Sequence, residues 1–156
     1  MRIILIDDEI AIIESLKFAL EPAGHKCELY TNPRNAIKAF KTGDYEAIVT
    51  DFKMPGMTGI DILKEVRKLS SHAPVIILTG YADIDNAIEA LNFGASAFFR
   101  KPFAIKDLME VLVRVEMEIK VRNERKDIYL QLKKKLENCN SNGSNTLELL
   151  DKLYIS

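Results

Sequence analysis

Residues 47–56 have the sequence Ala-Ile-Val-Thr-Asp-Phe-Lys-Met-Pro-Gly, a short apolar run that ends in Asp51 and is followed by a turn. Short runs rich in β-branched residues are typical of the buried strands of a parallel sheet. The pattern recurs up to about residue 104, and segments with apolar residues three or four positions apart separate the runs. This alternation predicts an α/β fold, a single doubly wound five-stranded parallel sheet with crossover helices.

The predicted strands and helices are bounded by turn and capping residues. The strands are Ile3 to Asp7, Lys26 to Tyr30, Ala47 to Asp51, Val75 to Leu78 and Ala97 to Arg100. The helices between them are predicted from stripes of residues expected to be buried: Ile13, Leu16 and Leu20; Ala36, Ile37 and Phe40; Leu63, Val66 and Leu69; Ile84, Ile88 and Leu91. Helix ends are expected near Gly24, Pro33, Gly43, Asp83 and Gly94.

A fifth helix is expected from near Ile105, and it continues as far as Glu137 without glycine or proline. Residues 1–120 are therefore predicted to form one compact domain, with residues 121–138 as a helical extension. Residues 139–156 are predicted to be a flexible segment, rich in asparagine and serine, followed by a short amphipathic helix from Thr146 to Tyr154.

The bulk composition gives no electrostatic preference for nucleic acid or membrane. The chain has 156 residues and a formal net charge of −1. The apolar run at residues 1–6 is too short for a signal peptide or a membrane span, so a cytoplasmic protein without membrane contact is expected. The lysines and arginines between Lys120 and Lys135 are interpreted as a solvated helix face, and His25 and His72 as solvent-facing residues that bind no ligand.

Five polar residues lie just past the carboxyl ends of four predicted strands: Asp7, Asp8, Asp51, Thr79 and Lys101. In a right-handed parallel sheet these ends share one edge, so the side chains are expected to converge. The second strand ends without a comparable residue, which suits an edge position. This also suits the strand order 2-1-3-4-5, which would put the aspartates at the switch point between the first and third strands.

Three neighbouring carboxylates repel one another, so the site is expected to need a cation. Mg²⁺ fits because it accepts one or two carboxylates, keeps waters and binds phosphate oxygen. Lys101 adds positive charge and Thr79 a hydroxyl donor, which together indicate a phosphoryl site. Asp51 is the predicted nucleophile, with Asp7 and Asp8 as metal ligands. The turn at Met54-Pro55-Gly56 could direct the Lys53 carbonyl toward the metal.

These motifs resemble the receiver domains of two-component response regulators. The resemblance covers about residues 1–120 and rests on Asp7-Asp8-Glu9, residues 50–57 (Thr-Asp-Phe-Lys-Met-Pro-Gly-Met), Thr79-Gly80, Gly94-Ala95, Phe98 and Lys101-Pro102. Around Asp51 the sequence is most like receivers of the nitrogen-regulatory transcription activators.

The resemblance implies a flavodoxin-like (βα)5 fold with an extended C-terminal helix. It also implies that Asp51 accepts a phosphoryl group from a sensor histidine kinase or a phosphotransfer protein. Lys101 would bind the phosphate, Thr79 would move toward it, and Phe98 would swing inward with Thr79. Such a chain is no true enzyme, since it performs only self-catalysed phosphoryl transfer and autodephosphorylation. DNA binding would require an effector domain absent from this chain.

Each signal alone has an ordinary structural interpretation. Asp8-Glu9 is a usual helix start, Asp51 a usual turn residue, and adjacent Phe98 and Phe99 a usual core pair. Only their order and expected convergence favour the receiver.

Two alternatives belong to other functional classes. An aspartyl-phosphate phosphatase would carry a second aspartate two residues after the first, whereas Asp7-Asp8-Glu9 does not. A phosphorylation-independent interaction module on the same fold is disfavoured by intact Asp8, Asp51 and Lys101. A homodimer through the fourth helix, fifth strand and extended fifth helix is also predicted, because a solitary long helix is marginally stable in water.

Overall fold

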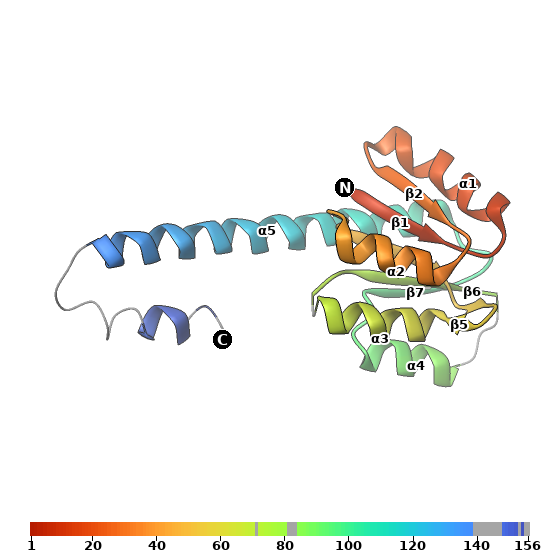
Figure 1. Ribbon diagram of the computed structural model, residues 1–156. Coiled ribbons are helices and arrows are strands. Elements are labelled where there is room, and N and C mark those ends of the chain that lie inside the picture. The colour runs from red at the N-terminus through yellow and green to blue at the C-terminus, as the bar shows by residue number, and fades with distance from the viewer. Residues whose placement is uncertain (71, 81–83, 139–147, 153, 155–156) are drawn as a thin grey trace. The chain divides into compact units, whose positions relative to one another are not determined.

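The computed structural model describes residues 1–70, 72–80, 84–138, 148–152 and 154 (Figure 1). The chain forms two compact units, Met1–Val115 and Glu116–Ser156, and helix α5 (Ile105–Asn138) contributes to both.

The first unit contains a five-stranded parallel sheet. Its elements are β1 (Arg2–Ile6), α1 (Ile10–Leu20), the 3-10 turn η1 (Glu21–Ala23), β2 (Lys26–Tyr30), α2 (Pro33–Thr42), β3 (Ala47–Asp51), β4 (Lys53–Met54), β5 (Met57–Thr58), α3 (Gly59–Leu69), β6 (Val75–Thr79), α4 (Ile84–Asn92) and β7 (Ala97–Arg100). The sheet order is β2-β1-β3-β6-β7, which confirms the order predicted for the five long strands. Strand ends differ from the predicted ones by a single residue at β1 and β6.

Each sheet face is buried under helices, as Figure 1 shows for α2, α3 and α4 on one face and α1 on the other. Alternate residues of a strand enter opposite cores: Ile4 and Ile6 pack with α2 and α3, whereas Ile3 and Leu5 pack with α1 and α5. Burial on both faces explains why the central strands are continuous apolar runs.

Predicted helix boundaries agree with the observed caps. Pro33 is the first residue of α2, and the Asn32 side chain accepts hydrogen bonds from the next backbone N–H groups. Gly24 (φ 87°) and Gly94 (φ 79°) adopt the left-handed conformation that ends a helix without steric cost. The predicted cap at Asp83 lies outside the described residues.

The predicted turn after Asp51 is part of a small antiparallel hairpin. Its two short strands were not predicted from the sequence. Lys53 pairs with Thr58 and Met54 with Met57, with Pro55 and Gly56 (φ 77°) between them. A proline followed by a glycine with positive φ is the expected composition of a tight turn.

The predicted burial is wrong for four residues. Ile88 and Leu91 of α4 are 52% and 57% exposed, because α4 turns Ala90, which is fully buried, toward the sheet. Leu69, at the last position of α3, is also exposed. His25 is buried rather than solvent-facing.

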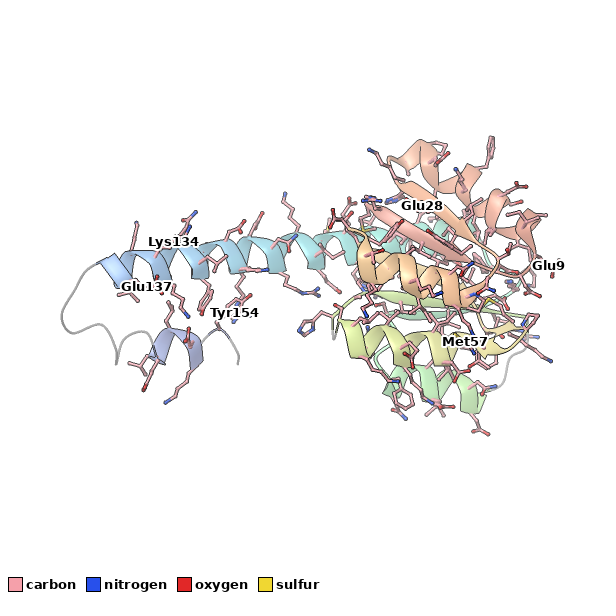
Figure 2. The ribbon with its side chains drawn as sticks, viewed as in Figure 1. Glu9, Glu28, Met57, Lys134, Glu137 and Tyr154 are labelled. Carbon is pink, nitrogen blue, oxygen red and sulfur yellow. The ribbon has the colours of Figure 1, made fainter. Side chains whose placement is uncertain are left out.

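The second unit contains the remainder of α5 and a short C-terminal helix that includes residues 148–152. Tyr154, labelled in Figure 2, stacks on Tyr129 with ring centroids 4.2 Å apart, and the Tyr129 hydroxyl donates to Asp151 at 2.5 Å. Lys133 lies 3.2 Å from the same carboxylate. The flexible break was predicted from Asn138 to Asn145, but Asn138 is the last residue of α5 and residues 139–145 lie outside the described part of the chain, as do residues 146 and 147 of the predicted short helix. No helix among the described residues has the length and apolar character needed to cross a membrane.

Candidate functional site

Three side chains from three strands meet at the carboxyl edge of the sheet. The Lys101 Nζ lies 2.6 Å from Asp51 Oδ1 and 2.9 Å from Asp7 Oδ2. The side chains of Asp7, Asp51 and Lys101 are 3%, 11% and 24% exposed. Because parallel strands end at one edge, residues separated by 94 positions in the sequence share a single ion-pair cluster.

The cluster holds its lysine charged. Burial alone would lower the pKa of Lys101, but hydrogen bonds and charges from Asp51 and Asp7 together outweigh it and raise the pKa above its ordinary value. Lys101 is therefore a fixed cation at neutral pH. It compensates two carboxylates at once.

Backbone N–H groups orient both carboxylates. The N–H of Lys53 donates to Asp51 Oδ2 at 2.7 Å, and the N–H of Glu9 donates to Asp7 Oδ1 at 3.0 Å. Each aspartate thus offers one oxygen to the lysine and the other to the chain that follows it. Such charge-assisted bonds fix the position of a carboxylate more firmly than solvent does.

The other predicted site residues lie around this cluster. Thr79 ends β6 and is buried, and its carbonyl accepts from the Lys101 N–H at 2.6 Å. Asp8 follows Asp7 and is exposed. The ring of Phe98 meets that of Phe52, the residue after Asp51. The hairpin begins at Lys53, two residues after Asp51, and the Lys53 side chain is exposed.

The carboxylates at this site could supply only some of the ligands of a hard divalent cation. Within the described residues, no group of three histidine, cysteine or acidic side chains is gathered closely enough to hold a metal by itself. Mg²⁺ does not require such a cage, since it keeps several waters and takes one or two carboxylates together with carbonyl or phosphate oxygen. The paired Asp7 and Asp51, with Asp8 alongside, agree with that preference.

A close backbone approach beside Asp51 was missed by the sequence analysis. A Cβ added to Gly59 would lie 2.8 Å from the Asp51 carbonyl oxygen, so only glycine lets α3 begin against the end of β3. The Gly59 N–H donates to the Phe52 carbonyl at 2.7 Å. A glycine at the start of a predicted helix was the available signal.

The same helix start carries a capping box that the sequence analysis also missed. Thr58 accepts from the Asp61 N–H at 3.1 Å, and Asp61 accepts from the Thr58 N–H at 2.9 Å. The Thr58 N–H and the Thr58 hydroxyl both donate to the Asp61 carboxylate, and these two bonds, the backbone one first, lower the pKa of Asp61. The spacing Thr-x-x-Asp was the signal in the sequence.

Comparison with known proteins now identifies the family. Residues 3–113 match the family model of the response regulator receiver domain. The chain belongs to this family. Receivers are signalling domains of two-component systems, so the predicted resemblance and the flavodoxin-like fold are confirmed.

Two transcriptional regulators are among the relatives of this receiver. It is 37% identical over 116 residues to the transcriptional regulatory protein QseB of Escherichia coli O157:H7, a match that covers 74% of this chain and 52% of QseB. It is 29% identical over 126 residues to the DNA-binding transcriptional regulator NtrC of Escherichia coli K12, covering 81% of this chain and 27% of NtrC. The matched part thus spans about half of QseB and less of NtrC.

Solved receivers have the same fold. A receiver domain protein from Clostridium thermocellum superposes with a TM-score of 0.73 at 36% identity, covering 77% of this chain and 97% of that one. The response regulator TrrA of Thermotoga maritima, in complex with Mg²⁺ and BeF, gives a TM-score of 0.67 at 31% identity, covering 73% and 97%.

Proposed function

We propose that this receiver accepts a phosphoryl group on Asp51 from a sensor histidine kinase or a phosphotransfer protein. The observation that carries the proposal is the joint pairing of Lys101 with Asp51 and Asp7, at 2.6 and 2.9 Å. A carboxylate oxygen of Asp51 forms the new bond to phosphorus. The bond from phosphorus to the donor's nitrogen or oxygen breaks, and the leaving group keeps the electron pair.

The surrounding residues have distinct roles in this proposal. Asp7, Asp8, Asp51 and the Lys53 carbonyl would hold Mg²⁺, which supplies positive charge against the phosphoryl oxygens. Lys101 would exchange its bond to the Asp51 carboxylate for one to the phosphoryl group. The chain performs only this self-catalysed transfer and the later loss of the phosphoryl group.

Phosphorylation would switch the conformation through Thr79 and Phe98. The new group adds a charge of about −1.5 to −2, and no further cation enters the site to balance it. Thr79, buried at the end of β6, can donate its hydroxyl to a phosphoryl oxygen. Phe98 would then move toward the space that Thr79 leaves. The altered surface would control an output or partner.

Intact-mass measurement tests the nucleophile. Incubation with acetyl phosphate and Mg²⁺ should add one phosphoryl group to the protein, and Asp51→Asn should show no adduct. Asp44→Asn is the matched control, because Asp44 is exposed and belongs to the loop before β3. An undiminished adduct on Asp51→Asn would remove Asp51 as the acceptor. Turnover of a generic phosphate ester would support the phosphatase alternative instead.

The receiver is also proposed to form a symmetric homodimer through α4, β7 and α5. Large apolar side chains on one side of α5 are exposed: Val113 46%, Met117 63%, Val121 63%, Ile128 58% and Leu132 44%. A two-fold pairing buries such a stripe twice, and Arg125 and Lys135 keep it from forming a sustained heptad. On α4, Ile88 and Leu91 add exposed apolar surface.

Light scattering with and without beryllofluoride tests the dimer. The double variant Val121→Arg, Ile128→Arg should be monomeric at tens of micromolar. Leu130→Arg is the control, since Leu130 is 42% exposed and lies on the opposite side of α5 from Ile128. Monomers for the wild-type chain in both conditions would refute the dimer.

The proposal also covers the domain boundaries of the chain and the compartment in which it acts. Residues 1–120 are the receiver, residues 121–138 extend its last helix, and residues 139–156 follow as a separate segment. DNA binding would need an effector domain outside residues 1–156, and the site of action would be the cytoplasm.

A further inference from the structure

Phe52, the residue that follows Asp51, is in contact with Phe98 of β7. The two rings meet edge to face, with centroids 6.2 Å apart and planes at 67°. Both side chains are half-buried and pack against the core beneath α2, α3 and α4. The contact therefore joins the residue that follows Asp51 at the end of β3 to strand β7, which Lys101 follows.

The main chain of Phe52 is fixed from two sides. Its N–H donates to the Leu78 carbonyl at 2.6 Å, and its carbonyl accepts from the Gly59 N–H at 2.7 Å. Strand β6 and helix α3 thus hold the Phe52 backbone. Its ring is therefore presented to Phe98 from a fixed anchor, and Phe98 is the partner whose movement makes or breaks the contact.

We propose that Phe52 is a positioning residue that holds Phe98 in the unphosphorylated arrangement. An edge-to-face aromatic pair contributes stabilisation beyond its buried area, and a contact made in only one of two states biases their equilibrium by its full amount. Asp51 would then be linked to Phe98 through its own neighbour as well as through Thr79. This inference rests on the proposed phosphorylation switch.

The molecule supplies an internal control on the same strand. Phe99, the next residue, contacts Phe103 with ring centroids 5.5 Å apart and planes at 35°. That pair packs into the opposite core, beneath α1 and α5. Truncating Phe99 removes a comparable aromatic contact without touching the one between Phe52 and Phe98.

A double-mutant cycle on beryllofluoride affinity, measured by calorimetry with saturating Mg²⁺, tests the inference. Phe52→Leu and Phe98→Leu should each lower the apparent Kd by about two- to tenfold, the range expected for one aromatic pair. The double variant should show no further decrease. Phe99→Leu should keep the wild-type Kd, and urea unfolding should show that all variants fold.

Three results would overturn the role of Phe52. They are an unchanged Kd in Phe52→Leu, an undiminished effect of Phe52→Leu in the Phe98→Leu background, or an equal decrease in Phe99→Leu. Failure of the wild-type chain to bind beryllofluoride and to accept acetyl phosphate would be a different outcome. It would overturn the phosphoryl site itself, and this inference with it.

Discussion

Each unit of the chain contains a lysine paired with aspartate, and the two clusters differ in burial. In the first unit, Lys101 joins Asp7 and Asp51, whose side chains are 3% and 11% exposed. In the second, Lys133 and Asp151 are 33% and 42% exposed. Solvent screens an exposed pair so that it contributes little, whereas removing one partner of a buried pair leaves a charge that the protein must compensate.

The clusters also differ in how their members are held. Three strands of one sheet and two backbone N–H groups orient Asp7, Asp51 and Lys101. The second cluster joins α5 to the short C-terminal helix, with the hydroxyl of Tyr129 as its additional donor. The same pair of residue types therefore forms the proposed phosphoryl site only where the fold fixes the side chains and excludes solvent.

The largest effect is expected from Lys101→Met. This change leaves two carboxylates adjacent with no cation, and loss of a buried partner should lower the free energy of unfolding by about 3 kcal/mol. Urea unfolding without divalent cations measures the loss, and added Mg²⁺ should recover part of it. Phosphorylation should persist but no longer alter amide exchange over residues 84–100. Equal stability with and without Lys101 would contradict the comparison.

A smaller effect is expected from Gly59→Ala. Replacing glycine by alanine in a helix ordinarily stabilises a protein, but here the new methyl would lie 2.8 Å from the Asp51 carbonyl oxygen and 3.2 Å from Phe52 Cα. Overpacking should therefore cost about 1–3 kcal/mol of unfolding free energy and slow the appearance of the phosphoryl adduct. Gly80→Ala is the control, because nothing lies within 4 Å of its added Cβ. Stabilisation by Gly59→Ala would show that α3 can move away without cost.

The strands and the convergence of the site were predictable because both depend on local rules. A strand buried on both faces must be apolar throughout, and parallel strands must end at one edge. Asp7, Asp51 and Lys101 could thus be brought together from their places after Ile6, Thr50 and Arg100.

The way in which separate elements pack against one another was not predictable from the sequence. In α4, the set with Ile88 and Leu91 and the set with Ala87 and Ala90 have similar helical spacing, and close packing on the sheet selects the small residues. The burial of His25 has no periodic signal. The contact of Phe52 with Phe98 depends on how the residue after β3 meets strand β7, which no spacing along the chain encodes.

The smallest effect is expected from Lys133→Met, the counterpart of Lys101→Met in the second unit. Lys133 is only half-buried, so solvent screens its pair with Asp151, and the urea midpoint of the receiver unit should stay unchanged while amide exchange at residues 148–152 becomes faster. Hydrogen bonding from Tyr129, followed by that from Lys133, lowers the pKa of Asp151. A group with a lowered folded pKa stabilises above its unfolded pKa, and this contribution is lost as the pH falls through the folded value. Protection at residues 148–152 should therefore decrease on acidification below about pH 4, the ordinary range of an aspartate.

Lys134→Met, at a neighbouring exposed position, should leave the exchange unchanged. A midpoint shift as large as that of Lys101→Met would mean that burial is not what separates the two clusters.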